Sequence, residues 1–138
     1  MKIRMVTLII LLSIIPAVCH ANDVVVITNK SVSETTLTKD ELINIYLGKK
    51  SSWNNGKRIW FAVLKGNTHA AFLKDYIGKS ESQFNTFWKK QVFTGKGKPP
   101  KQFDSDRAMV EFVAQTTGAV GYVSAGTDVS KVKAITPK

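Results

Sequence analysis

The chain has 138 residues, of which 20 are basic and 10 are acidic, so its formal net charge at neutral pH is +10. It contains one cysteine, Cys19, which excludes an internal disulfide framework and a multi-thiolate metal site. A chain of this size is expected to form one domain with a modest core, and its excess of cations favours anionic partners.

The first 21 residues have the layout of a secretory signal peptide. Lys2 and Arg4 precede an apolar run over residues 5–18, and Ala21 ends a short stretch typical of a cleavage site. Cleavage after Ala21 would leave residues 22–138, without cysteine and with a net charge of +8 once Lys2 and Arg4 are removed. The alternative is a signal-anchor in the membrane. Either way the chain is predicted to be exported, which argues against nucleic acid as a partner.

The first half of the remaining chain predicts two strands and two helices. A β-branched run at Asp23–Asn29 predicts a buried strand. Thr38 and Glu41 have the spacing of a capping box and open a helix over 38–47. An Asn-Gly turn then leads into an apolar strand at Arg58–Leu64. A polar loop separates this strand from a helix over 70–77, and the apolar positions of the two helices are Leu42, Ile45, Tyr46, Phe72, Leu73, Tyr76 and Ile77.

The second half continues the alternation. Ser80 and Gln83 form a second capping-box spacing at the start of a helix, which ends in a basic, proline-rich loop at Thr94–Lys101. Asp104 or Ser105 can cap the next helix, and strands are predicted over 119–123 and 132–136. The apolar positions of these helices are Phe84, Phe87, Trp88, Val92, Met109, Phe112 and Val113. Alternating strands and helices predict one α/β domain over 22–138, with a largely parallel sheet and helices on both faces.

Three segments resemble a known family when they are taken together. They are LTKDELINIYLGKKSSW (37–53), VFTGKGKPP (92–100) and TTGAVGYVS (116–124). In this order they resemble the periplasmic phosphate-binding proteins, the solute receptors of phosphate ABC importers. The resemblance implies one lobe of a type II periplasmic binding protein and non-enzymatic capture of a solute in the periplasm for transport or sensing. The receptors close two lobes around the solute, and this chain has residues for about one.

The loop between the second strand and its helix is the first candidate site. Ligands of open α/β sheets favour such loops, where the N–H groups of a helix start are exposed. Lys65, Asn67, Thr68 and His69 could therefore bind phosphate or another small anion; alternatively, Asn67 or Thr68 only caps the helix. The receptors carry an Arg-Ser-Asp-x-Ser-Gly-Thr segment here. This chain has Lys65 without that arginine, and lysine offers a point charge instead of a planar fork.

A second hypothesis is that the protein is an adaptor or regulatory module that keeps the fold of the lobe but binds no solute. It would dock on a membrane surface, a transporter, a porin or a sensor through Lys49, Lys50, Trp53, Lys96 and Lys98, and a second copy of the chain could complete a two-sided cleft. Trp60 and Trp88 are expected in the core, and Trp53, as an alternative to the surface role, could fold back over the end of its helix. The sequence contains no nucleophile elbow, no phosphate loop and no metal-ligand spacing. We therefore expect no enzyme activity, no cofactor and no metal.

Overall fold

The computed structural model describes residues 24–138, so the predicted signal peptide lies outside the described residues. The strands are β1 (Val24–Thr28), β2 (Trp60–Leu64), β3 (Lys101–Phe103), β4 (Ala119–Ser124) and β5 (Lys133–Ile135). The helices are α1 (Lys39–Tyr46), α2 (Asn67–Phe72) with its π-helical continuation η1 (Leu73–Ile77), α3 (Glu81–Phe93) and α4 (Asp106–Gln115). None of these helices combines the length and the apolar character needed to span a bilayer.

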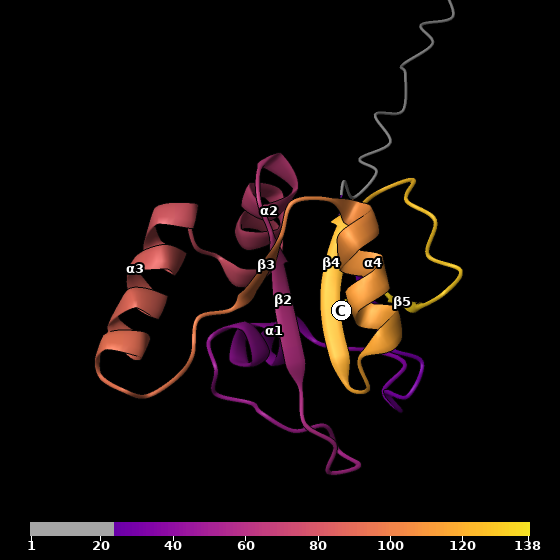
Figure 1. The fold of residues 1–138 in the computed structure, drawn as a ribbon, viewed down its shortest axis with the longest axis horizontal. Coiled ribbons are helices and arrows are strands. Elements are labelled where there is room, and N and C mark those ends of the chain that lie inside the picture. Colours follow the sequence, from indigo (N-terminus) through magenta and orange to yellow (C-terminus); the bar gives the residue numbers. More distant parts are fainter. Residues whose placement is uncertain (1–23) are drawn as a thin grey trace, which may run out of the picture.

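The strands form one five-stranded sheet in the order β3-β2-β4-β1-β5 (Figure 1). β2 is parallel to both β3 and β4, whereas β1 is antiparallel to its neighbours β4 and β5. Four strands therefore run in one direction, which confirms the predicted, largely parallel α/β sheet. The first strand of the chain lies between the last two.

Helices cover both faces of the sheet, as predicted. On one face α4 packs so closely on β4 that a Cβ at Gly121 would lie 2.5 Å from Met109 Sδ. The next residue, Tyr122, points to the other face because side chains alternate along a strand. There its ring stacks on Phe72 of α2 at 3.8 Å and lies near Tyr46 of α1. Helix α3 stands to one side, next to β2 and β3 (Figure 1).

The helix starts follow the sequence signals. At α1, Glu41 N–H donates to Thr38 Oγ1 at 3.1 Å, and Thr38 N–H donates back to Glu41 Oε2 at 2.8 Å. This backbone hydrogen bond from Thr38 lowers the pKa of the Glu41 carboxyl. Ser80 and Gln83 form the same reciprocal pair at α3. At α4 the cap is Ser105, not Asp104.

Three expectations about single segments are wrong. Strand β3 begins within the predicted loop at Thr94–Lys101, and its three residues, two of them exposed, give no apolar pattern. Trp60 opens β2 but is 45% exposed, so it does not belong to the core. Trp53 is only 2% exposed, because its indole N–H donates to Gly118 O at 2.8 Å inside the protein.

The backbone at Gly118 gives a test of the fold. Gly118 has φ +78°, and an added Cβ would lie 2.2 Å from Arg58 O, whereas Gly126 has φ +87° and open space around it. Gly126→Ala should lower the free energy of unfolding by about 1–2 kcal/mol from left-handed backbone strain alone. Gly118→Ala adds a backbone clash and should lower the free energy of unfolding by clearly more. Urea unfolding followed by circular dichroism measures both variants, and equal losses would contradict this packing.

Candidate functional site

The carboxyl ends of the parallel strands β2, β3 and β4 meet at one edge of the sheet. The loop after β2 opens α2, the loop after β3 opens α4, and β4 ends at Ser124. Five polar side chains from these segments form what we call the carboxyl-edge cluster: Lys65, Thr68, Asp104, Asp106 and Ser124.

Contacts within the carboxyl-edge cluster link all three strand ends. Lys65 Nζ lies 3.1 Å from Asp104 Oδ1, and both side chains are largely exposed. Thr68 Oγ1 is 3.4 Å from Ser124 Oγ. Asp106 accepts a hydrogen bond from Ser124 N–H at 3.1 Å and another from the Ser124 hydroxyl. The hydrogen of that hydroxyl is thereby used, so Ser124 Oγ can only accept from a further group.

The start of α2 is free of a side-chain cap. Its N-cap is Gly66, with φ +88°, and no side chain accepts from the first turn. The alternative in which Asn67 or Thr68 caps this helix is therefore wrong. Asn67 is exposed and Thr68 is partly buried at this edge.

His69 turns away from the other predicted site residues. It is 2% exposed, and its Nδ1 lies 2.5 Å from the hydroxyl of Tyr122, which accepts a hydrogen bond from Leu64 N–H at 3.0 Å. A phenol has one hydrogen, and within residues 24–138 Nδ1 is the acceptor it reaches. Tyr122 therefore donates to Nδ1, and the proton of the neutral imidazole sits on Nε2. Burial lowers the pKa of His69 and raises that of Tyr122, so both are neutral near pH 7.

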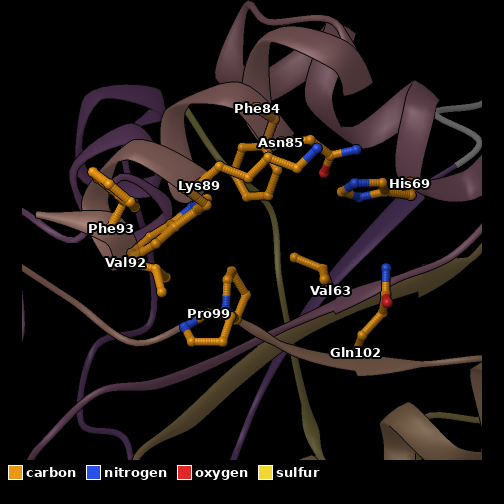
Figure 2. A pocket seen from close by; sticks show the side chains of 11 residues that line it. Val63, His69, Phe84, Asn85, Lys89, Val92, Phe93, Pro99 and Gln102 are labelled. Carbon is orange, nitrogen blue, oxygen red and sulfur yellow. The ribbon is translucent and has the colours of Figure 1, made fainter. Parts of the chain in front are cut away.

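The imidazole of His69 faces a groove of about 530 Å³ between α3 and the strands β2 and β3. We call it the α3 groove. Figure 2 shows His69 and Gln102 at one end of it and Val92 and Phe93 at the other. Its walls are mainly apolar, and they are formed by Val63, Phe84, Trp88, Val92, Phe93, Pro99 and Pro100. Sequence reasoning missed this groove, because the segment 92–100, which holds Phe93 and the two prolines, indicates a family and a basic loop but not a concave surface.

A second groove, of about 650 Å³, lies at the amino end of β2. We call it the basic groove, and its cations are Lys50, Arg58, Lys96, Lys98 and Lys101. Three of the predicted partner-surface lysines thus lie together, whereas Lys49 is exposed outside the groove lining. Trp60, instead of the buried Trp53, is the exposed indole here, and the Arg58 guanidinium lies 4.3 Å from its ring centre. In the part of the chain that the structure describes, no acidic residue lines this groove.

Within residues 24–138, no three histidine, cysteine or carboxylate side chains gather in a geometry that would hold a metal ion. The described surfaces offer lysine and arginine cations, carboxylates, hydroxyl groups, one neutral imidazole and exposed aromatic rings.

Burial of neutral His69 predicts a pH dependence of stability. An unfolded histidine takes up a proton near pH 6.5, whereas folded His69, whose pKa is lowered, resists protonation. The unfolded state then binds more protons, so the free energy of unfolding should fall between about pH 7.5 and about pH 5.5. Urea titrations across this range should show the slope, and His69→Gln should flatten it. Glu41 loses its contribution only at lower pH. An unchanged slope in the variant would contradict this assignment.

Comparison with known proteins places the fold. No family model and no curated protein matches the chain. Among solved structures, it is similar to an ABC-type phosphate transport receptor from Vibrio cholerae, with a TM-score of 0.57 and 21% identity over 82% of this chain and 45% of that one. For PstS from Borrelia burgdorferi the TM-score is 0.65, with 15% identity over 84% of this chain and 47% of that one. For a phosphate ABC transporter substrate-binding protein from Clostridium perfringens with bound phosphate, the TM-score is 0.63, with 18% identity over 83% and 44%.

The chain spans less than half the length of each of these three proteins. At this level of identity the similarity establishes the fold. The predicted resemblance is therefore confirmed for the fold. The described part of the chain has a lobe-sized portion of the fold of phosphate transport receptors.

Proposed function

We propose that this protein is an exported, non-enzymatic solute-binding module that holds phosphate or a similar small oxyanion at the carboxyl-edge cluster. The observation that carries the proposal is that the Lys65–Asp104 ion pair and the Thr68–Ser124 hydroxyl pair lie at the same sheet edge, beside the uncapped start of α2. Open α/β sheets bind ligands at this edge. The similarity to receptors named for phosphate, one of them with phosphate bound, supports the choice of anion.

The carboxyl-edge cluster suits an oxyanion that carries a hydrogen. The exposed pair of Lys65 and Asp104 is worth only about 0–1 kcal/mol, so Lys65 can exchange its carboxylate for a ligand oxygen at low cost. Thr68 can donate its hydroxyl hydrogen, whereas Ser124 already donates to Asp106. Ser124 Oγ would therefore accept from a P–OH group. Phosphate near neutral pH has such a group and sulfate does not, which predicts a preference for phosphate.

Isothermal titration of phosphate into the purified protein tests this site. The protein should be expressed with its own N-terminal segment, so that any processing occurs in the cell. We expect saturable one-to-one heat that survives physiological salt, weaker binding of sulfate, and at least about a fivefold loss of phosphate affinity in Lys65→Gln, since an ion-assisted hydrogen bond contributes more than 1 kcal/mol.

The matched control is Lys30→Gln. Lys30 follows β1, and the end of β1 pairs with the start of β4, so Lys30 lies at the opposite edge of the sheet. Its substitution removes the same charge as Lys65→Gln. Equal losses in the two variants, or heat that disappears with salt, would mean only diffuse attraction of anions by net charge.

The basic groove favours a second candidate function, that of an adaptor for an acidic segment of an envelope protein such as a transporter or sensor. Of its five cations, only Lys50 forms an ion pair within residues 24–138, with Glu41 at 3.4 Å. Exposed tryptophan and arginine side chains are also the types that anchor protein interfaces. This groove is at the amino end of β2, so an adaptor would leave the carboxyl-edge cluster free.

A pull-down from envelope extract tests the adaptor. The wild-type protein should retain a stoichiometric partner that both Trp60→Ala and Arg58→Gln lose, because the two side chains stack as one unit. Lys74→Gln removes an exposed charge on η1 and should retain the partner. The adaptor is excluded if nothing is recovered, or if all four proteins recover the same set.

A further inference from the structure

The α3 groove is a concave surface distinct from the carboxyl-edge cluster, and it adjoins the basic groove, with which it shares Trp88, Pro99 and Pro100. Its volume of about 530 Å³ lies within the range of small-molecule sites, which are mostly apolar with a few placed polar groups. Val92 is 42% exposed and Phe93 is 93% exposed, so the apolar end of the groove is open to water. Exposed apolar side chains beside a concave wall are a typical feature of a binding site.

The opposite end of the groove holds a donor without a protein partner. The His69 side chain is 98% buried, its Nδ1 is occupied by Tyr122, and within residues 24–138 its Nε2 has no hydrogen-bond partner. Nε2 carries the proton, so it presents an N–H group to the groove. This N–H is fixed in direction by the bond at Nδ1 and is free to donate to a ligand oxygen.

Three further donors lie around this end. Gln102 from β3 lies there with His69 (Figure 2), and Asn85 and Lys89 line the groove from α3. Asn85 and Lys89 are four residues apart and so share a face of the helix. Among residues 24–138, no carboxylate lines the groove. Glu81, on the first turn of α3, acts on the charge of His69 from outside the lining.

We propose that the α3 groove binds a small amphipathic carboxylate. Its apolar body lies against Trp88, Val92 and Phe93, and its carboxylate accepts from His69 Nε2–H and from the Lys89 ammonium. The occupant is a small molecule because the donors converge at one end of a concave wall. An extended peptide would instead need backbone partners along its whole length. The site does not depend on anion binding at the carboxyl-edge cluster.

The probe is 4-phenylbutanoate, with 4-phenylbutanamide as its neutral counterpart. Trp88 lies in the wall of the groove, so binding should change tryptophan fluorescence in a saturable way. Two-dimensional ¹H–¹⁵N spectra should show shifts at residues of α3 and at Gln102, and little change at Lys65 or Ser124. Phosphate added at saturating concentration should not displace the probe, which separates this site from the proposed function.

Matched variants test the two polar anchors. Lys89→Gln should weaken 4-phenylbutanoate about fivefold and leave the amide unchanged. Lys90→Gln removes the same charge from an exposed neighbour outside the lining and should have no effect. His69→Phe keeps an aromatic ring while removing the N–H, and it should weaken binding of both probes about fivefold.

Phe93→Ser tests the apolar wall. It changes a side chain that the fold does not bury, so it should weaken binding of both probes without changing the melting temperature.

Several outcomes would overturn the proposal. Equal affinities of the wild-type protein for 4-phenylbutanoate and 4-phenylbutanamide would refute recognition of a carboxylate group. An unchanged affinity in Phe93→Ser would refute the groove even if His69→Phe failed to fold. Spectral shifts confined to the basic groove would show that the probe is attracted by net charge. No saturable change at all would mean that the groove does not take this class of molecule.

Discussion

The buried hydroxyl of Tyr122 is the interaction on which the rest of the fold depends. The parallel pairing of β2 with β4 covers Trp60 and Phe61 and stops there. Beyond that point Leu64, which pairs with Phe103 of β3, has no partner in β4, and its N–H donates to the phenol oxygen of Tyr122. The same hydroxyl fixes the proton position on His69, and the same ring stacks on Phe72. One side chain of β4 thereby contacts both β2 and α2 and holds them together.

This arrangement separates three surfaces with different chemistry on one small scaffold. The carboxyl-edge cluster mixes lysine, hydroxyl and carboxylate groups, the basic groove carries cations around an exposed indole, and the α3 groove is apolar with one buried donor. Trp88, Pro99 and Pro100 line both grooves, and the Trp88 indole N–H donates to Tyr46 O at 3.0 Å. The position of α3 relative to α1 therefore determines the shape of both grooves.

The local elements could be predicted because their signals are local. Thr38 with Glu41 and Ser80 with Gln83 mark helix starts through bonds three residues apart, and the apolar runs of β1, β2 and β4 stand out by composition. Other features depend on distant partners. Nothing near Trp53 indicates that Gly118 O, 65 positions later, would accept from its indole.

The candidate site was predicted only in part for the same reason. Lys65, Asn67 and Thr68 lie at the strand edge because the direction of β2 follows from the alternation of elements. His69 is one residue further on, but helical geometry turns its ring inward to Tyr122, 53 positions later in the chain. Ser124 and Asp106 joined the carboxyl-edge cluster through pairing of β4 with its neighbours, which the sequence pattern does not specify.

The place of β1 has a consequence for how the chain reaches its native state. β1 is synthesised first, yet both of its neighbours, β4 and β5, come from the last 20 residues of the chain. Lys138 N–H also donates to Leu37 O, which ties the final residue to the segment before α1. Contacts this far apart in sequence form slowly, because a long loop must close before they contribute. The sheet therefore cannot be completed until residues 119–135 have been synthesised, and until then the apolar strand β1 has neither of its neighbouring strands to pair with.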